Sequence, residues 1–412
     1  MTATSSSRLS LRTPFRGLPK EAAILSSVSF TVALGYGIVA PAIPAFARQF
    51  GVSVAAAASV ISAFALLRII GAMPAGRLVD RFGEPAVMAV GIGIVAVSSV
   101  LAGFSGSFGE LLVLRGVGGF GSAMFSVRAQ ALLLASVPTD LRGRASGLYT
   151  GGFLLGGISG PAVGGLVAAW SLRAPFFIYG VLLLIPTVIA AFVLRHATAS
   201  RGARSAGRSL ATLAASLRSR AYRAAATANL ADNFAAMGVR AALVPLFVRD
   251  VLHRTPLWTG IGFGVFAAVN GLVLLPGGRI ADTRGRRPVI VAGCAICAAG
   301  LAMLAVLPGE WAFLLSLAVA AVGSGLLDVA PAAMIGDLAS EGSGGGMLVA
   351  AYQMAGDTGT VLGPVVAGLL VDAASYSVAF GVAAAVLALA AVLSFLAPET
   401  RRGGGPGGSM AL

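Results

Sequence analysis

The chain has 412 residues, of which 57% are hydrophobic and only 11% are charged, and its formal net charge is +14. A soluble domain of this size could not keep so much apolar surface away from water, and 15 acidic residues are too few to solvate a globule. The composition therefore excludes a soluble enzyme or binding domain and indicates a protein that is solvated by lipid.

Apolar runs of about 20 residues, each long enough to cross a bilayer, predict twelve membrane helices. The first six are expected at residues 21–47, 53–79, 86–105, 108–135, 144–169 and 174–195, and the second six at 222–249, 257–281, 288–307, 310–339, 344–371 and 375–397. The predicted fold is thus an all-α membrane protein with an N-terminal six-helix bundle (21–195) and a C-terminal six-helix bundle (222–397). The remaining segments are predicted to be an arm (1–20), a basic linker (196–221) and a tail (398–412).

The basic residues predict how these helices are oriented. With twelve spans both termini lie on one side, and the segments on that side hold most of the 29 Lys and Arg residues. The opposite loops hold four basic residues, namely Arg48, Arg173, Arg249 and Arg254. The positive-inside rule therefore places the arm, the linker and the tail in the cytoplasm. Spread over loops in this way, the charge disfavours nucleic acid as a partner.

The source is indicated by composition alone. Lys20 is the one lysine among the basic residues, and Ala and Gly are abundant. This usage is typical of a high-GC bacterial genome, so we expect a multi-pass protein of the bacterial cytoplasmic (inner) membrane.

Two stretches, one in each half, have nearly the same sequence. Residues 73–83 read MPAGRLVDRFG, and residues 275–285 read LPGGRIADTRG. Each follows one long apolar run and precedes another, so the chain consists of two copies of one membrane unit. Parallel repeats with a substrate site between them are an architecture of secondary transporters.

These stretches and three further motifs resemble the major facilitator superfamily over essentially the whole chain. The Gly-Arg-x-x-Asp-x-x-Gly element between helices 2 and 3, and again between helices 8 and 9, is similar to its signature loop. The run from Leu111 to Gly121 resembles its helix-4 motif, with Gly118 where Gln is common. A Gly-Pro motif in helices 5 and 11 is similar to one found in the drug:proton antiporter branch; its members are Gly156, Gly160, Pro161, Gly164 and Gly165, and then Gly359, Gly363, Pro364 and Gly368.

The small residues of the Gly-Pro motif have a physical use. Glycines at four-residue spacing let another helix approach closely, and a helical proline permits a bend. Such a face suits a contact that slides or hinges, although static packing explains the same pattern.

The resemblance implies that the repeated loops are gates, which clamp the two halves in the outward-open state. The gating residues are expected to be Gly76, Asp80 and Arg81 in the first copy, and Gly278, Asp282 and Arg286 with Asp337 in the second. The second copy should be the stronger latch, because the first has Glu84 and Pro85 where basic residues are expected and Leu133 near the position that matches Asp337. The first copy would then be weaker or use Arg81 instead. Ordinary solvated loop charges are the alternative.

Charges inside the membrane helices are the most informative residues for mechanism. Each costs roughly 2.5–3.5 kcal/mol at a helix centre, so each needs a partner or a function. The acids are Asp232, Asp328 and Asp357, and the bases are Arg68, Arg115, Arg128 and Arg240. At 1.5 Å per residue, Arg68 and Asp357 lie at matching depths of roughly 16–20 Å from the inner helix ends. We therefore expect an ion pair between the two halves.

The acids and Arg115 are candidates for proton coupling, together with Arg68. Asp232 and Asp328 are expected at similar depths, and two carboxylates in a region of low dielectric can share one proton near neutral pH. Fixed salt bridges with arginines are the alternative. Candidate substrate contacts in the cavity are Tyr36, Asn233, Arg128 and Arg240.

Other chemistry is not expected. Cys294 and Cys297 have CxxC spacing, but they lie in helix 9, which we predict to be peripheral and lipid-facing, and no second ligand pair completes a metal set. No cofactor, metal or enzymatic activity is predicted. The chain is interpreted as a monomeric, proton-coupled exporter of a small, partly apolar molecule. An uptake transporter, proton-coupled or facilitative, and a non-transporting receptor or scaffold remain as alternatives.

Overall fold

The computed structural model describes residues 20–135, 137, 141–193, 219–307, 309–340 and 345–400. The regular structure within these ranges is helical. The first repeat contains α1 (Lys20–Val39), α2 (Ala42–Ala47), η1 (Arg48–Phe50), α3 (Val54–Phe82), α4 (Glu84–Gly103), α5 (Phe108–Ala135), α6 (Arg142–Ala168) and α7 (Ala174–Val193). The second contains α9 (Arg220–Asn233), η4 (Phe234–Leu243), α10 (Val244–Asp250), α11 (Pro256–Arg284), α12 (Arg286–Val306), α13 (Glu310–Leu327), α14 (Ala330–Ser340), α15 (Gly345–Ala373) and α16 (Tyr376–Phe395).

These helices lie where the apolar runs predicted the twelve spans. Within the described ranges, ten helical segments are long and apolar enough to cross a membrane. The other two predicted spans correspond to α5, with 28 residues, and α7, with 20 residues. The prediction of an all-α membrane fold is confirmed.

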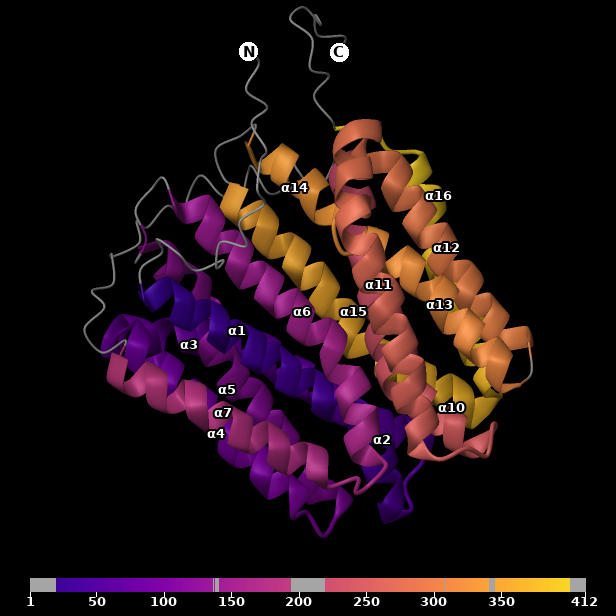
Figure 1. Cartoon of the computed structure of the whole chain (residues 1–412), viewed down its shortest axis with the longest axis horizontal. Coiled ribbons are helices and arrows are strands. Elements are labelled where there is room, and N and C mark those ends of the chain that lie inside the picture. The colour runs from indigo at the N-terminus through magenta and orange to yellow at the C-terminus, as the bar shows by residue number, and fades with distance from the viewer. Residues whose placement is uncertain are drawn as a thin grey trace, which may run out of the picture.

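The two repeats form separate groups of helices (Figure 1), each with a buried apolar core of its own. Successive spans run in opposite directions, which gives the molecule two faces. We call the face where α1 begins and α16 ends the proximal face, and the opposite face, where α3, α11 and α16 begin, the distal face. The short helices α2 and α10 meet at the distal face.

Three spans that were predicted as single helices are interrupted. The first breaks at Ala40 and Pro41, between α1 and α2, and the tenth breaks at Asp328 and Val329, between α13 and α14. Pro41 lies in the first break and Pro331 follows the second, and a proline lacks the N–H group that a continuous helix needs. The apolar pattern does not record such breaks, because the side chains stay hydrophobic across them.

The seventh span changes its helical type. Between α9 and α10 the chain forms a π-helix of ten residues, Phe234–Leu243, and Pro245 lies in the first turn of the α-helix that follows. π-Helical segments are rare and often occur at functional sites. The widened turn lies in the middle of the span.

The repeats contact each other mainly through two pairs of helices, α3 with α15 and α6 with α11. Backbones touch at both contacts: a Cβ atom on Gly368 would lie 2.6 Å from the Cα atom of Ala55, and one on Gly165 would collide with Gly260. Both contacts lie toward the distal face. Together with the α2–α10 contact, they close this side of the molecule.

Candidate functional site

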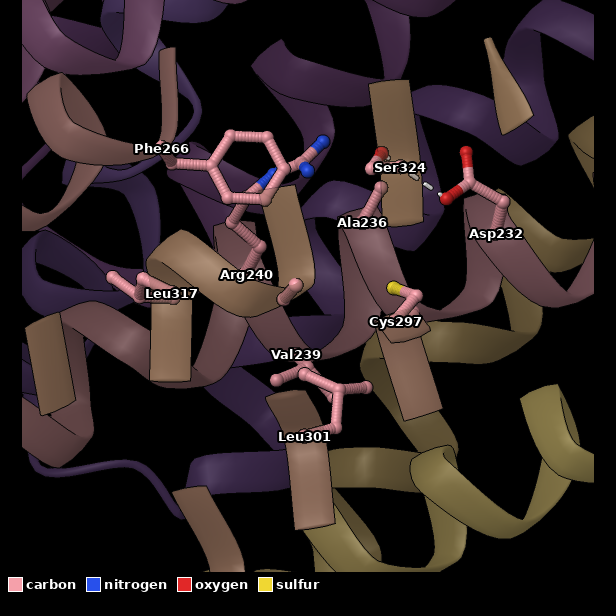
Figure 2. Close-up of a pocket in the computed structure, with 11 residues that line it drawn as sticks. Asp232, Ala236, Val239, Arg240, Phe266, Cys297, Leu301, Leu317 and Ser324 are labelled. Carbon is pink, nitrogen blue, oxygen red and sulfur yellow. Dashed lines mark hydrogen bonds between the residues drawn. The ribbon is translucent and has the colours of Figure 1, made fainter. Parts of the chain in front are cut away.

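Asp232 lies beside a small cavity inside the second repeat, shown in Figure 2. The cavity has a volume of about 20 Å³, which is enough for about one water molecule. Its walls come from η4, α11, α12 and α13 besides Asp232 at the end of α9: Ala235, Ala236, Val239, Arg240, Phe266, Cys297, Leu301, Leu317, Ala320 and Ser324. Asp232 accepts a hydrogen bond of 3.2 Å from the Ser324 hydroxyl.

The π-helix brings Asp232 and Arg240 to the same cavity. In an uninterrupted α-helix, eight residues would turn the second side chain about 80° away from the first. Each residue of a π-helix turns through a smaller angle, so Arg240 comes back toward the side of Asp232. The Arg240 guanidinium stacks on the Phe266 ring with 4.1 Å between its carbon and the ring centroid. The cavity therefore has an acidic end and a basic end.

Asp328 lies at the break between α13 and α14, close enough to interact electrostatically with Asp232. Its carboxylate accepts a 3.0 Å hydrogen bond from the side-chain amide of Asn270 on α11. Asn270 is 1% exposed, and its Oδ1 atom has no hydrogen-bond partner among the described residues. Two carboxylates, one amide and one hydroxyl thus form a polar cluster inside an apolar bundle. Asn270 and Ser324 were not among the predicted site residues, although an Asn within an apolar run is a usable signal of a polar site.

Arg68 of α3 and Asp357 of α15 form an ion pair between the repeats, through Nη2 and Oδ1. This contact was predicted from the equal depths of the two residues in their helices. The two side chains are 32% and 30% exposed, so the pair lies at the edge of the packed core. A half-buried pair of this kind can be broken and remade at lower cost than a fully buried one.

Arg115 has a different environment. It is 1% exposed, and its three guanidinium nitrogens have no hydrogen-bond partner among the described residues. The group stacks on Phe64 with 4.6 Å to the ring centroid, and Tyr36 packs on the same ring at 5.3 Å. Phe64 and Phe266 occupy matching positions in the two repeats, 202 residues apart as Asp80 and Asp282 are. An arginine therefore stacks on each of the two rings, Arg115 of α5 on Phe64 and Arg240 of η4 on Phe266.

The candidate substrate contacts do not share one site. Tyr36 reaches across the repeats, with its hydroxyl 3.9 Å from the Met237 sulfur. The Asn233 amide instead bonds Asn229 on its own helix and accepts a 3.4 Å hydrogen bond from Thr360, so it faces α15. Arg240 lines the cavity with Asp232, and the side chain of Arg128 is outside the described ones.

The loop after α11 forms a charged network. Arg286 bonds Asp282, and its Nε atom bonds Asp337 of α14 at 3.2 Å, as the sequence predicted. Glu399 accepts hydrogen bonds from the backbone N–H groups of Arg286 and Arg287, at 2.9 and 3.1 Å. All of these residues belong to the second repeat or to the segment after it. The network therefore braces the proximal end of one repeat in this state.

The first copy of the loop is described less fully. Arg81 is exposed and lies over the Phe82 ring, at 5.2 Å from its centroid. The side chains of Asp80 and Glu84 lie outside the described ones. A Cβ atom added to Gly76 would have open space around it, whereas one added to Gly278 would lie 3.6 Å from the Val329 Cγ1 atom.

The Gly-Pro motifs make two kinds of contact. Gly156, Gly160 and Gly164 pack on α1, where an added Cβ on Gly160 would lie 2.6 Å from the Leu34 carbonyl oxygen. In the same way Gly359 and Gly363 pack on α9 and η4. The last glycine of each motif, Gly165 or Gly368, contacts the other repeat instead. The motif thus fixes helix pairs within a repeat and touches the interface at one end.

The two cysteines correct one expectation. Cys294 and Cys297 are 0% and 4% exposed, and Cys297 lines the cavity beside Asp232. The prediction that they face lipid was wrong, because α12 packs on α13 and α16 and turns this side inward. Among the described residues no group of three His, Cys, Asp or Glu side chains could hold a metal ion.

Two repeats of membrane-length helices, joined across a half-buried ion pair, define a multi-pass membrane protein. The chain belongs to the Major Facilitator Superfamily, whose family profile matches residues 25–253 and again 225–410. A bacterial homologue of the human lysosomal transporter Spinster, solved in an inward-facing, unoccupied conformation, has the same fold. Its TM-score is 0.78 at 16% identity, over 91% of this chain and 96% of that one.

Curated relatives are similar over a shorter range. Multidrug resistance protein 2 of Bacillus subtilis (strain 168) is 32% identical over 174 residues, 42% of this chain and 43% of its own length. Quinolone resistance protein NorA of Staphylococcus aureus is 27% identical over 177 residues, 43% of this chain and 45% of its own length. The chain thus matches less than half the length of these relatives.

Proposed function

We propose that this protein exports a small, partly apolar molecule in exchange for protons, by alternating access between the two repeats. The observation that carries the proposal is the polar cluster of Asp232 and Asp328 beside a cavity of the second repeat. Two neighbouring carboxylates in low dielectric favour a state that holds one proton. The similarity to relatives named for multidrug and quinolone resistance supports drug-like compounds as the exported class.

In the proposed cycle the carboxylate cluster takes up a proton from the distal side and releases it on the proximal side. Arg240, at the other end of the cavity, stabilises the deprotonated form. The cavity has room for about one water molecule, which can pass a proton between Asp232 and the rest of the cluster. Asp357 is the third candidate carrier, and its ion pair with Arg68 opposes protonation.

The test uses purified protein in liposomes that enclose a pH-sensitive dye. The probes are ethidium and a quinolone, both partly apolar. Substrate addition should release protons from the unmodified protein. Asp232→Asn and Asp328→Asn should lose proton flux while they keep substrate exchange, because a neutral amide cannot carry the proton. Asp357→Asn should show a smaller loss.

Asp250→Asn is the matched control, since Asp250 is bonded to Arg249 and Tyr376 at the distal end of its span. It should keep full proton flux. Substrate movement without proton release in the unmodified protein would instead favour facilitative transport, and full coupling in all three Asp variants would place the carrier elsewhere.

The remaining features of the proposal concern the whole molecule. The proximal face is cytoplasmic, the distal face is outside, and the protein acts as a monomer in the bacterial inner membrane. The loop charges support this orientation through the positive-inside rule.

A further inference from the structure

The first turn of α3 receives its hydrogen-bond acceptors from two parts of the molecule. The first N–H groups of any α-helix have no partner inside the helix. Here the Ala56 N–H donates to the Ser53 hydroxyl at 3.2 Å, which is an ordinary N-cap. The two preceding N–H groups, of Val54 and Ala55, find their acceptor in the other repeat.

That acceptor is Asp372, at the distal end of α15. Its Oδ1 atom accepts from the Val54 N–H at 2.9 Å, and its Oδ2 atom accepts from the Ala55 N–H at 2.8 Å. The carboxylate also faces the positive end of the α3 dipole. Both oxygens of one side chain therefore bind the start of a helix 318 residues away in the sequence.

Two neighbouring groups place Asp372 for this contact. Gly368 lies one turn earlier on α15, and its missing side chain lets α15 approach the backbone of Ala55. Arg48, at the distal end of the first span, bonds the Val52 carbonyl and lies close enough to attract Asp372. The contact thus joins the first two spans of one repeat to the eleventh span of the other.

The matching position in the other pair of helices lacks both partners. The Gly-Pro motifs of the two repeats are 203 residues apart, as Gly160 and Gly363 show. At this spacing Asp372 corresponds to Ala169 at the end of α6. Alignment of Asp80 with Asp282 pairs Val54 with Pro256, which has no N–H group. Gly165 and Gly260 still touch there. The backbones therefore meet at both contacts, but the carboxylate joins them at only one.

We propose that Asp372 is a one-sided latch that holds the distal face closed by capping α3 across the two repeats. The inference rests on alternating access in the proposed function. When the distal face opens, α15 must leave α3, and both N–H groups exchange a carboxylate for water. A charge-assisted contact of this kind favours the closed state.

The test measures the opening directly. Spin labels are attached at Gly109→Cys on α5 and Leu307→Cys after α12, both exposed at the distal face, in a chain that also carries Cys294→Ala and Cys297→Ala. Double electron–electron resonance then gives the ratio of distal-open to distal-closed molecules. Asp372→Ala should raise this ratio about fivefold, the usual effect of losing a helix cap. Asp372→Asn, which keeps one neutral acceptor oxygen, should raise it less.

Two further variants separate the latch from general damage. Val54→Pro removes one donor and copies Pro256 of the other repeat, and proline is tolerated at the first position of a helix. It should also raise the ratio, and combining it with Asp372→Ala should add little, because both changes remove one contact. Glu310→Gln removes a distal charge that pairs with Arg254 of its own repeat, and it should leave the ratio unchanged.

An unchanged ratio in both Asp372→Ala and Val54→Pro would overturn the proposal, as would an equal rise in Glu310→Gln. If Asp372→Ala does not fold, Asp372→Asn and Val54→Pro decide the outcome. The distances require neither substrate nor a proton gradient. Failure of the latch is therefore distinguishable from failure of proton-coupled export.

Discussion

At the scale of single residues, the charged side chains of the spans meet three kinds of partner. Arg68 and Asp357 form an ion pair, Asp232 accepts a hydrogen bond from a hydroxyl, and Arg115 and Arg240 stack on aromatic rings. An ion pair fixes charge on both sides, whereas a carboxylate with a neutral partner is free to exchange its proton. The three environments therefore suit different tasks in one transport cycle.

The ion pair between the repeats gives the first prediction. Arg68→Gln and Asp357→Asn should each lower transport about tenfold, because each leaves one half-buried charge without its partner. The charge swap Arg68→Asp with Asp357→Arg should restore more activity than either single change keeps. Initial rates of ethidium efflux would measure this. Equal loss in all three variants would count against a functional pair.

Arg115 gives a second prediction, in which one substitution raises stability and abolishes transport. A buried guanidinium without hydrogen-bond partners in the described structure costs free energy of folding, and stacking on Phe64 returns only about 2 kcal/mol. Arg115→Met should therefore raise the unfolding temperature in detergent while transport is lost. The control is Arg254→Met at the exposed distal end, which should change neither. A lower unfolding temperature in Arg115→Met would show that the arginine is structural.

At the scale of helices, small residues and breaks decide how the spans pack. The Gly-Pro motif of α6 sets its distance to α1, and the π-helix sets which side chains of the seventh span face the cavity. Both are backbone properties that the neighbouring helix must accommodate. Changes at these positions should therefore act through packing rather than through charge.

Gly160 and Gly157 on α6 provide a matched pair for the third prediction. A Cβ on Gly160 would lie 2.7 Å from the Gly37 Cα atom, whereas Gly157 has open space beside it. Gly160→Ala should reduce stability by about 1–3 kcal/mol through overpacking, and Gly157→Ala should leave it unchanged or raise it, because Ala favours helix. Thermal unfolding in detergent would measure both. Similar losses at the two positions would contradict a role for close helix approach.

The proximal loops give the fourth prediction. Asp282→Asn should shift the protein toward the proximal-open state more than Asp80→Asn does. The expectation is that these loops clamp the two repeats when the proximal face is closed. Asp282 already has Arg286 and Asp337 in place as a bonded network, whereas the first copy has Leu133 near the position that matches Asp337. Distances between spin labels across the proximal face would report the shift. The reverse order of the two variants would refute the asymmetry.

At the scale of the whole molecule, the contacts between repeats gather from the middle of the spans to the distal face. They include the ion pair of Arg68, the bond from the Ser62 hydroxyl to the Val361 carbonyl at 2.6 Å, and the cap at Asp372. This distribution is that of a transporter closed on its distal side. The structure therefore represents one end of the proposed cycle.

Orientation gives the fifth prediction. Green fluorescent protein fused after residue 412 should fluoresce, because that reporter folds in the cytoplasm, and alkaline phosphatase at the same place should be inactive. The Gly109→Cys variant, with its new thiol on the distal face, should react with a membrane-impermeant maleimide in intact cells. Active phosphatase together with an unreactive Gly109→Cys variant would mean that the orientation is reversed.

The membrane class, the twelve spans, the duplication and the depth match of Arg68 with Asp357 could all be predicted from the amino-acid sequence. These properties depend on local hydropathy and on the fixed rise of a helix, which a linear pattern records. The packing of the helices determines which way each side chain faces: Cys297 lies toward Asp232, Asn233 toward Thr360, and Arg115 on Phe64. It also decided the π-helix, the break at Asp328 and the cap of Val54 by Asp372. These features depend on how distant helices pack, and in an apolar chain every face of a helix looks equally able to be buried.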